Sequence, residues 1–171
     1  MTLYVPSLSI DDVIVALDDF ITPFIAPLPA VRAQVNRVPL PKSGGAVLTE
    51  LLQVPLSIPE TAWIPQDNLI SITGPARIDV QIDIYGPNAG SQAKAIMGSM
   101  RTGWGYDAFP VTVKPLYTSD AIQAPLITGE QQYESRWTLT VSMQYNPELE
   151  VPQQFADEAS VATTTAADII Q

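Results

Sequence analysis

Polar and apolar residues alternate almost without a break between Arg136 and Tyr145. The odd positions of this stretch, from Trp137 to Tyr145, carry large and mainly apolar side chains. A period of two residues is typical of a β-strand with one buried face and one face exposed to water. We therefore expect a long strand, which Asn146-Pro147 should end. Its polar face would consist of Arg136, Thr138, Thr140, Ser142 and Gln144.

A second alternating stretch spans residues 77–85. Its apolar face would consist of Ile78, Val80, Ile82 and Ile84, and its polar face of Arg77, Asp79, Gln81, Asp83 and Tyr85. Residues 69–73 (LISIT) form another apolar run directly before it, and GPA (74–76) lies between the two. Glycine and proline favour turns, so this arrangement predicts a hairpin that turns at residues 74–76.

Apolar residues at intervals of three and four predict two helices. The first covers residues 9–22 (SIDDVIVALDDFIT), with Ser9 as its N-cap and Pro23 at its end. The second lies within residues 86–104 (GPNAGSQAKAIMGSMRTGW), with Asn88 as its N-cap and Gly103 as its stop.

The remaining segments give weaker signals. Residues 31–38 predict a short strand, and residues 46–54 predict a buried strand, although the adjacent leucines at 51 and 52 leave a helix possible. Residues 109–117 (FPVTVKPLY) predict a strand at an edge or a bend, because Pro115 has no amide N–H to donate. We expect residues 55–67 to form a loop, and residues 118–130 a loop or a short helical turn.

The order of these elements predicts an α+β fold. Its sheet would be mainly antiparallel, with two helices packed on one face and a long C-terminal strand. Residues 1–152 would form a single domain. Residues 153–171 are small, polar and acidic, and we expect them to form an extended C-terminal tail that is flexible or dependent on a partner.

Composition limits the chemistry that the chain can perform. Of its 171 residues, 46% are hydrophobic and 15% are charged, which supports a packed core. The formal net charge of −10 argues against tight binding to nucleic acid, because such binding depends on lysine and arginine. The chain has no cysteine and no histidine, so thiol nucleophiles, Cys/His zinc sites and histidine acid–base catalysis are excluded.

Searching for other chemistry gives no candidate catalytic, cofactor-binding or metal-binding residues. Asp79 and Asp83 would lie roughly 13 Å apart along one strand, too far to form a carboxylate pair by themselves. The acidic helix DDVIVALDD lacks the ligand spacing of a calcium loop, and neither KSGG nor GPNAG contains a phosphate-binding motif. We expect a structural or interaction protein and not an enzyme, with no signal peptide and no membrane span.

Several stretches together resemble a family of tailed-bacteriophage neck proteins, the tail terminator or tail completion proteins at the head–tail joint. The stretches follow one another between residues 36 and 156, and the N-terminal helix also fits the family. They are NRVPLPK, VQIDIYGPNA, FPVTVKPLY, GEQQYESRWTLTVSMQYNP and VPQQFA.

The resemblance implies a ring, usually a homohexamer, that caps the tail tube and joins it to the head connector. It implies contact with the sheath protein if the tail is contractile, and contact with DNA only in transit. The protein would belong to the neck of the virion and assemble in the host cytoplasm. The two polar strand faces, Arg77 to Asp83 and Arg136 to Gln144, would line the lumen or a subunit interface. Ring contacts would come from Trp104, Tyr106, Phe109 and Phe155.

Two alternatives remain open at this point. One is a head-completion or connector ring, or a tube-like ring protein, of the same particle. The other is a small hydrolase or sugar-binding domain, against which the missing histidine and cysteine weigh.

Overall fold

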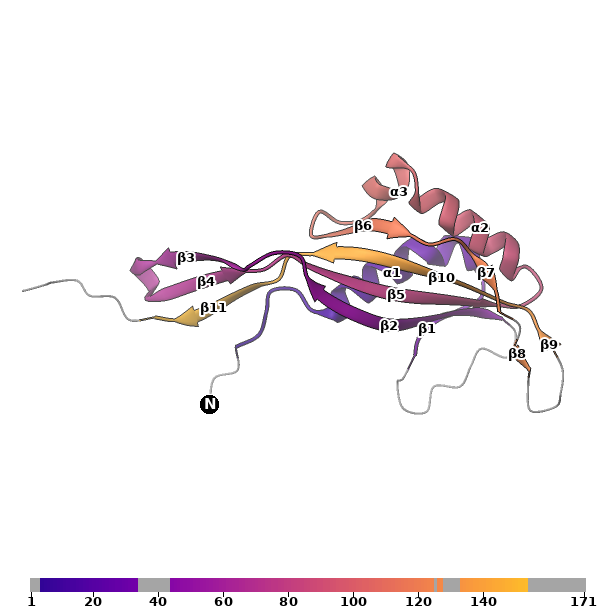
Figure 1. Ribbon diagram of the computed structural model, residues 1–171, viewed down its shortest axis with the longest axis horizontal. Helices are drawn as coiled ribbons and strands as arrows, with labels where there is room; N and C mark the ends of the chain where they lie inside the picture. Colours follow the sequence, from indigo (N-terminus) through magenta and orange to yellow (C-terminus); the bar gives the residue numbers. More distant parts are fainter. Residues whose placement is uncertain (1–3, 34–43, 125, 128–132, 154–171) are drawn as a thin grey trace, which may run out of the picture.

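A computed structural model describes residues 4–33, 44–124, 126–127 and 133–153. The chain forms a six-stranded sheet with helices on one side, and a three-stranded sheet that extends from one end of it (Figure 1). The predicted α+β class with mainly antiparallel pairing is confirmed.

The larger sheet is built around strand β5 (Ala76–Tyr85), which lies between β2 (Gly45–Pro55) and β10 (Arg136–Tyr145). Strand β1 (Ala30–Arg32) extends the β2 side and is parallel to β2. On the other side, β6 (Val113–Thr118) and the short β7 (Ile122–Gln123) both pair with β10, antiparallel like the central strands. A separate short pair joins β8 (Leu126–Ile127) and β9 (Tyr133–Glu134). The expected edge strand is thus found as β6, but it covers Val113–Thr118 and not residues 109–117.

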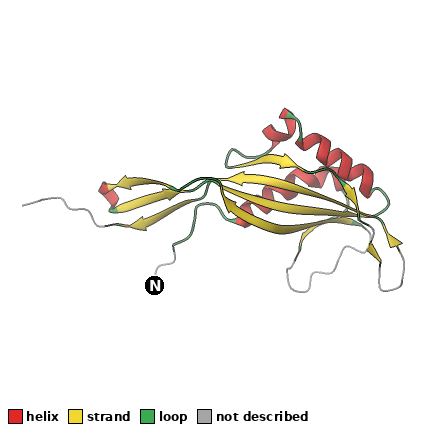
Figure 2. Cartoon of the chain, viewed as in Figure 1, coloured by secondary structure: helices red, strands yellow, loops and turns green. Residues whose placement is uncertain are grey.

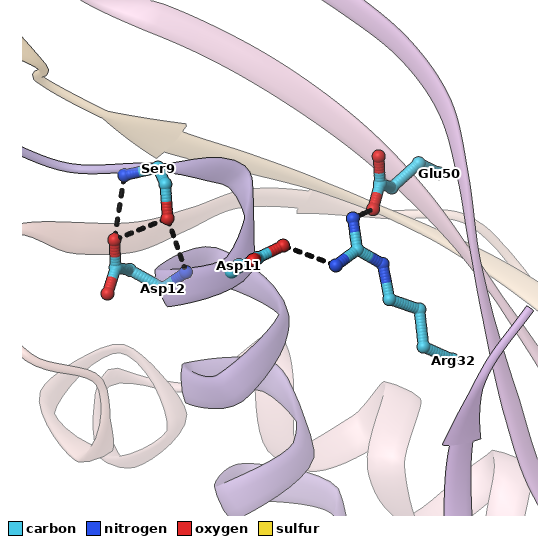
Figure 3. A network of polar contacts seen from close by, with 5 residues as sticks. All are labelled: Ser9, Asp11, Asp12, Arg32 and Glu50. Carbon is cyan, nitrogen blue, oxygen red and sulfur yellow. Dashed lines mark hydrogen bonds and ion pairs between the residues drawn. The ribbon is translucent and has the colours of Figure 1, made fainter. Parts of the chain in front are cut away.

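Helix α1 (Ile10–Ile25) begins as its sequence predicts. The Ser9 hydroxyl accepts from the Asp12 amide, and the Asp12 carboxylate accepts from both the amide and the hydroxyl of Ser9 at 2.7 Å (Figure 3). These bonds stabilise the charged carboxylate and hold the pKa of Asp12 below its usual value. The helix does not end at Pro23, as predicted, but continues to Ile25, with proline in its last turn.

An arginine ties the start of α1 to the sheet. Arg32 on β1 forms ion pairs with Asp11 in the first turn of α1 and with Glu50 on β2 (Figure 3). The hydrogen bond to Asp11, together with the interactions with Glu50, raises the pKa of Arg32 above its usual value. One guanidinium group thus joins three elements that are far apart in the sequence.

The core lies between the larger sheet and the helices. Register places Leu139 opposite Ile82 and Val141 opposite Val80, and all four side chains are almost completely buried. The side chains of Leu17 and Ile21 bring α1 to this cluster, and Ala93 and Ile96 bring α2 (Ala89–Met100). The predicted apolar face of residues 137–145 packs under the helices, as expected.

The smaller sheet forms an arm, which we define as strands β3 (Glu60–Ile64), β4 (Leu69–Thr73) and β11 (Glu148–Pro152) with the 3-10 turn Pro65–Asp67 (Figure 2). Each arm strand continues one of the three central strands. Strand β2 leads into β3, β4 leads into β5, and β10 leads into β11.

A narrow waist separates the arm from the larger sheet. Each of the three connections that cross the waist contains proline. Pro55 is the last residue of β2, Pro59 lies between β2 and β3, Pro75 lies between β4 and β5, and Pro147 lies between β10 and β11. Proline cannot donate a hydrogen bond to a ladder, which explains why the pairing divides into two sheets here. Two backbone hydrogen bonds join neighbouring strands at the waist itself, from Leu56 N to Pro75 O at 2.8 Å and from Gly74 N to Pro147 O at 3.3 Å.

Two predictions about the residues around the waist are wrong, a hairpin at residues 69–85 and a loop at residues 55–67. Residues 69–73 and 77–85 do not form a hairpin, because β4 pairs with β3 and β11, whereas β5 pairs with β2 and β10. The GPA segment joins two strands that run in the same direction, and the turn of this region lies at residues 65–68 instead. Residues 55–67 are not a loop throughout, since they contain β3.

The second helix also differs in detail. Helix α2 ends at Met100, and Gly103 does not stop it but starts the short helix α3 (Gly103–Ala108). The side chain of Asn88 makes no capping hydrogen bond, whereas Thr102 caps α3 by accepting from the Gly105 amide. Residues 103–108, which begin at the predicted stop of the second helix, are therefore helical as well. The expected tail, residues 153–171, lies outside the described residues except for Gln153.

Helix α3 depends on glycine at position 105. A Cβ atom there would lie 2.1 Å from the carbonyl oxygen of Ser99, so Gly105→Ala should lower the free energy of unfolding by about 1–3 kcal/mol through overpacking. Chemical denaturation would measure this loss. As controls, Gly98→Ala and Gly103→Ala place Cβ where nothing lies within 4 Å, and neither should destabilise the fold. Equal effects at all three positions would contradict the prediction.

Candidate functional site

The structure brings all the predicted polar strand residues together on one surface. Strands β5 and β10 pair in register, so Thr138 lies opposite Asp83 and Ser142 lies opposite Asp79. These side chains are on the face opposite the helices, which we call the open face. Its members on the two strands are Arg77, Asp79, Gln81, Asp83, Tyr85, Arg136, Thr138, Thr140, Ser142 and Gln144.

Asp83 is the most buried charged group of the open face. Its side chain is 6% exposed and accepts hydrogen bonds from Arg136 Nε at 3.1 Å, Arg136 Nη2 at 2.9 Å and Gln81 Nε2 at 2.9 Å. The two arginine bonds reach different carboxylate oxygens, which is the strongest geometry for this pair. The guanidinium also lies over the Tyr85 ring, with 5.9 Å from its carbon to the ring centroid.

Asp79 is neutralised in a similar way. Its carboxylate accepts from Ser142 Oγ at 2.6 Å and from Arg77 Nη2 at 3.3 Å, and Arg77 Nε lies 3.2 Å from it. Each aspartate of the open face therefore has its own arginine, and the four charges cancel. The charged groups on β5 and β10 present no net charge to whatever faces them.

Sequence reasoning identified these residues but not their neighbours. The open face also carries Thr49 from β2 and Tyr117 from β6, because these residues lie opposite Gln81 and Ser142. Leu52 joins them next to Asp79, since a bulge after Glu50 shifts the register of β2 by one residue. The alternation of polar and apolar residues along one strand does not indicate which other strand will pair with it.

The predicted ring contacts fall in different environments. Trp104 and Tyr106 lie on α3 with 63% and 48% of their surfaces exposed. Phe109 is 3% exposed and stacks against Phe20 of α1, with ring centroids 4.7 Å apart. Its side chain is part of the core of its own chain. Phe155 lies outside the described residues.

A groove of about 720 Å³ separates α1 from α3 and the segment that follows it. We call it the α1–α3 groove. Apolar residues line it, including Val15, Phe20, Pro23, Trp104, Phe109 and Pro110, and the acidic residues Asp12 and Asp19 also border it. The sequence did not predict this groove, because α3 begins where the second helix was expected to stop.

Within the described part of the chain, no group of three or more acidic residues is arranged to hold a metal ion. No described helix has the length and apolar character needed to cross a membrane.

The chain is a small α+β protein with three distinctive surfaces: a charge-neutral open face, an apolar groove and a projecting arm. Comparison with family models then identifies the family. The model for phage neck terminator proteins matches residues 11–167, and the chain belongs to this family. The chain is thus a virion structural protein of the phage neck, as the resemblance implied. A search of curated proteins found no match.

The ion pair between Arg136 and Asp83 is predicted to matter for stability. Arg136→Met leaves a buried carboxylate without its cation, and the free energy of unfolding should fall by up to about 3 kcal/mol. The matched control is Lys94→Met, which removes the same charge from an exposed position on α2 and should change stability by less than about 0.5 kcal/mol. Urea denaturation of both variants tests this, and similar losses would refute the assignment.

Proposed function

We propose that the chain forms a ring, a homohexamer, that caps the tail tube and joins it to the head connector. The match to phage neck terminator proteins over residues 11–167 carries this proposal. In a contractile tail the ring would also meet the sheath protein. DNA would pass through the channel of the ring, and the ring would assemble in the host cytoplasm before it enters the virion. In this proposal residues 1–152 are the assembling domain, and residues 153–171, with Phe155, contact partners.

The open face is the proposed lining of the channel. DNA binding is dominated by cations that neutralise phosphates, and a channel that conducts DNA should not hold it. On the open face Arg77 is paired with Asp79, and Arg136 is paired with Asp83. Because each arginine already faces a carboxylate, its positive charge is balanced and its attraction for phosphate is weakened. Serine, threonine and glutamine side chains supply the rest of the surface on these two strands.

Helix packing supports the same orientation. The opposite face of the larger sheet is covered by α1 and α2, so its strands are closed to a channel on that side (Figure 1). An acidic chain with a net charge of −10 also repels DNA along the rest of its surface. Both features favour passage of DNA over retention.

The purified chain mixed with isolated tail tubes tests the proposal. Negative-stain imaging should show one sixfold ring at one end of each tube, and native mass measurement should give a discrete closed oligomer. Three outcomes would contradict the proposal: a twelvefold ring on the head, copies along the whole length of the tube, or free monomers in the presence of tubes.

A further inference from the structure

The arm has an apolar face and an acidic face. Register places Ile70 opposite Val151 and Ile72 opposite Leu149, so these four side chains share one face of the arm. Trp63 lies on the same face opposite Ile70 and is 58% exposed. We call this surface the apolar arm face. The carboxylates of Glu60, Glu148 and Glu150 lie on the other face, because each is opposite Thr73 or Ser71.

The apolar arm face continues the buried face of the larger sheet. Every second residue points to the same side of a strand. Ile70 and Ile72 are therefore on the same side as Ala76 and Ile78, which lie under the helices. By the same rule Leu149 is on the side of Tyr145. The helices α1, α2 and α3 lie beside the larger sheet, and on the arm Figure 2 shows only the 3-10 turn at its tip. Sheet faces of this composition are normally packed against another layer.

The α1–α3 groove offers a matching surface elsewhere on the molecule. Val15 and Trp104 expose 59% and 63% of their surfaces there, and the Trp104 ring lies 6.0 Å from that of Phe20. Asp12 and Asp19 border the groove, so a partner that brought carboxylates would be repelled. The apolar arm face brings none, because the carboxylates of its strands are on the opposite side.

An arm cannot fill the groove of its own chain. The arm continues the strands of the larger sheet beyond the waist and projects from one end of that sheet, away from α3 (Figure 1). A contact between two different surfaces of identical chains is heterologous, and its repetition closes into a ring when the rotation allows. We infer that the apolar arm face of one copy docks in the α1–α3 groove of the next copy. This inference rests on the proposed ring, which supplies the neighbouring copy.

Adjacent residues on β3 give a matched pair of variants. Trp63→Asp places a carboxylate on the apolar arm face, opposite the acidic border of the groove, and should weaken ring formation on tail tubes by at least about tenfold. Ala62→Asp adds the same charge one residue away, on the acidic face, and should leave ring formation within about twofold of the native chain. Circular dichroism of both variants checks that the fold is intact. Equal loss of ring formation in the two variants would overturn the inference.

Cross-linking identifies the partner surface, and the chain has no cysteine of its own to interfere. A chain with both Trp63→Cys and Val15→Cys, oxidised on tail tubes, should give a covalent ladder up to the size of the ring. Each single variant should stay monomeric on a denaturing gel. The control pair, Trp63→Cys with Tyr117→Cys on the open face, should give no ladder.

The possible failures can be told apart. Rings at the tube ends without a ladder in the Trp63/Val15 pair would overturn the arm contact and leave the proposed function standing. Dimers from Trp63→Cys alone would show that arms pair with each other, which also overturns it. Absence of any ring on the tubes would overturn the proposed function and, with it, the contact.

Discussion

The register between β5 and β10 is the constraint on which the rest of the structure depends. Ten consecutive residue pairs, from Arg136–Tyr85 to Tyr145–Ala76, hold these strands together without a shift. Because side chains alternate, this one alignment places the apolar side chains of both strands under the helices and the aspartates and arginines on the opposite side. A slip of one residue would bury Asp79 and Asp83 in the core and expose Ile78 and Ile82 to solvent.

The two faces set by this register have separate roles in our account. The helix side supplies the packed core, and beyond the waist its apolar character continues onto the arm, where the described helices no longer cover it. The opposite side carries charges that are satisfied by each other and not by an external ligand. The charge-neutral face suits a channel for DNA, and the apolar arm suits contact between subunits. One pattern of alternation would thus provide both surfaces of the proposed ring.

Features with a local physical cause could be predicted from the sequence. The N-cap at Ser9, the two alternating strands and the polar residues of the open face all follow from spacing within one segment. The arm could not be predicted in this way, because Gly74-Pro75 has the composition of a turn but joins two strands in line. Gly74-Pro75 separates two strands in line because it lies beside Pro55, Pro59 and Pro147 at the waist, and these prolines are distant from it in the sequence. Likewise, α3 depends on how closely Gly105 approaches Ser99, which sequence spacing does not reveal.

Cryo-electron microscopy of the neck in the intact phage particle tests the central claim most directly, because it fixes the orientation of every subunit. Our account predicts one ring of this chain between the tail tube and the head connector, with Arg77, Asp79, Asp83 and Arg136 facing the channel axis. A ring in which these side chains face outward, away from the channel, would contradict the account.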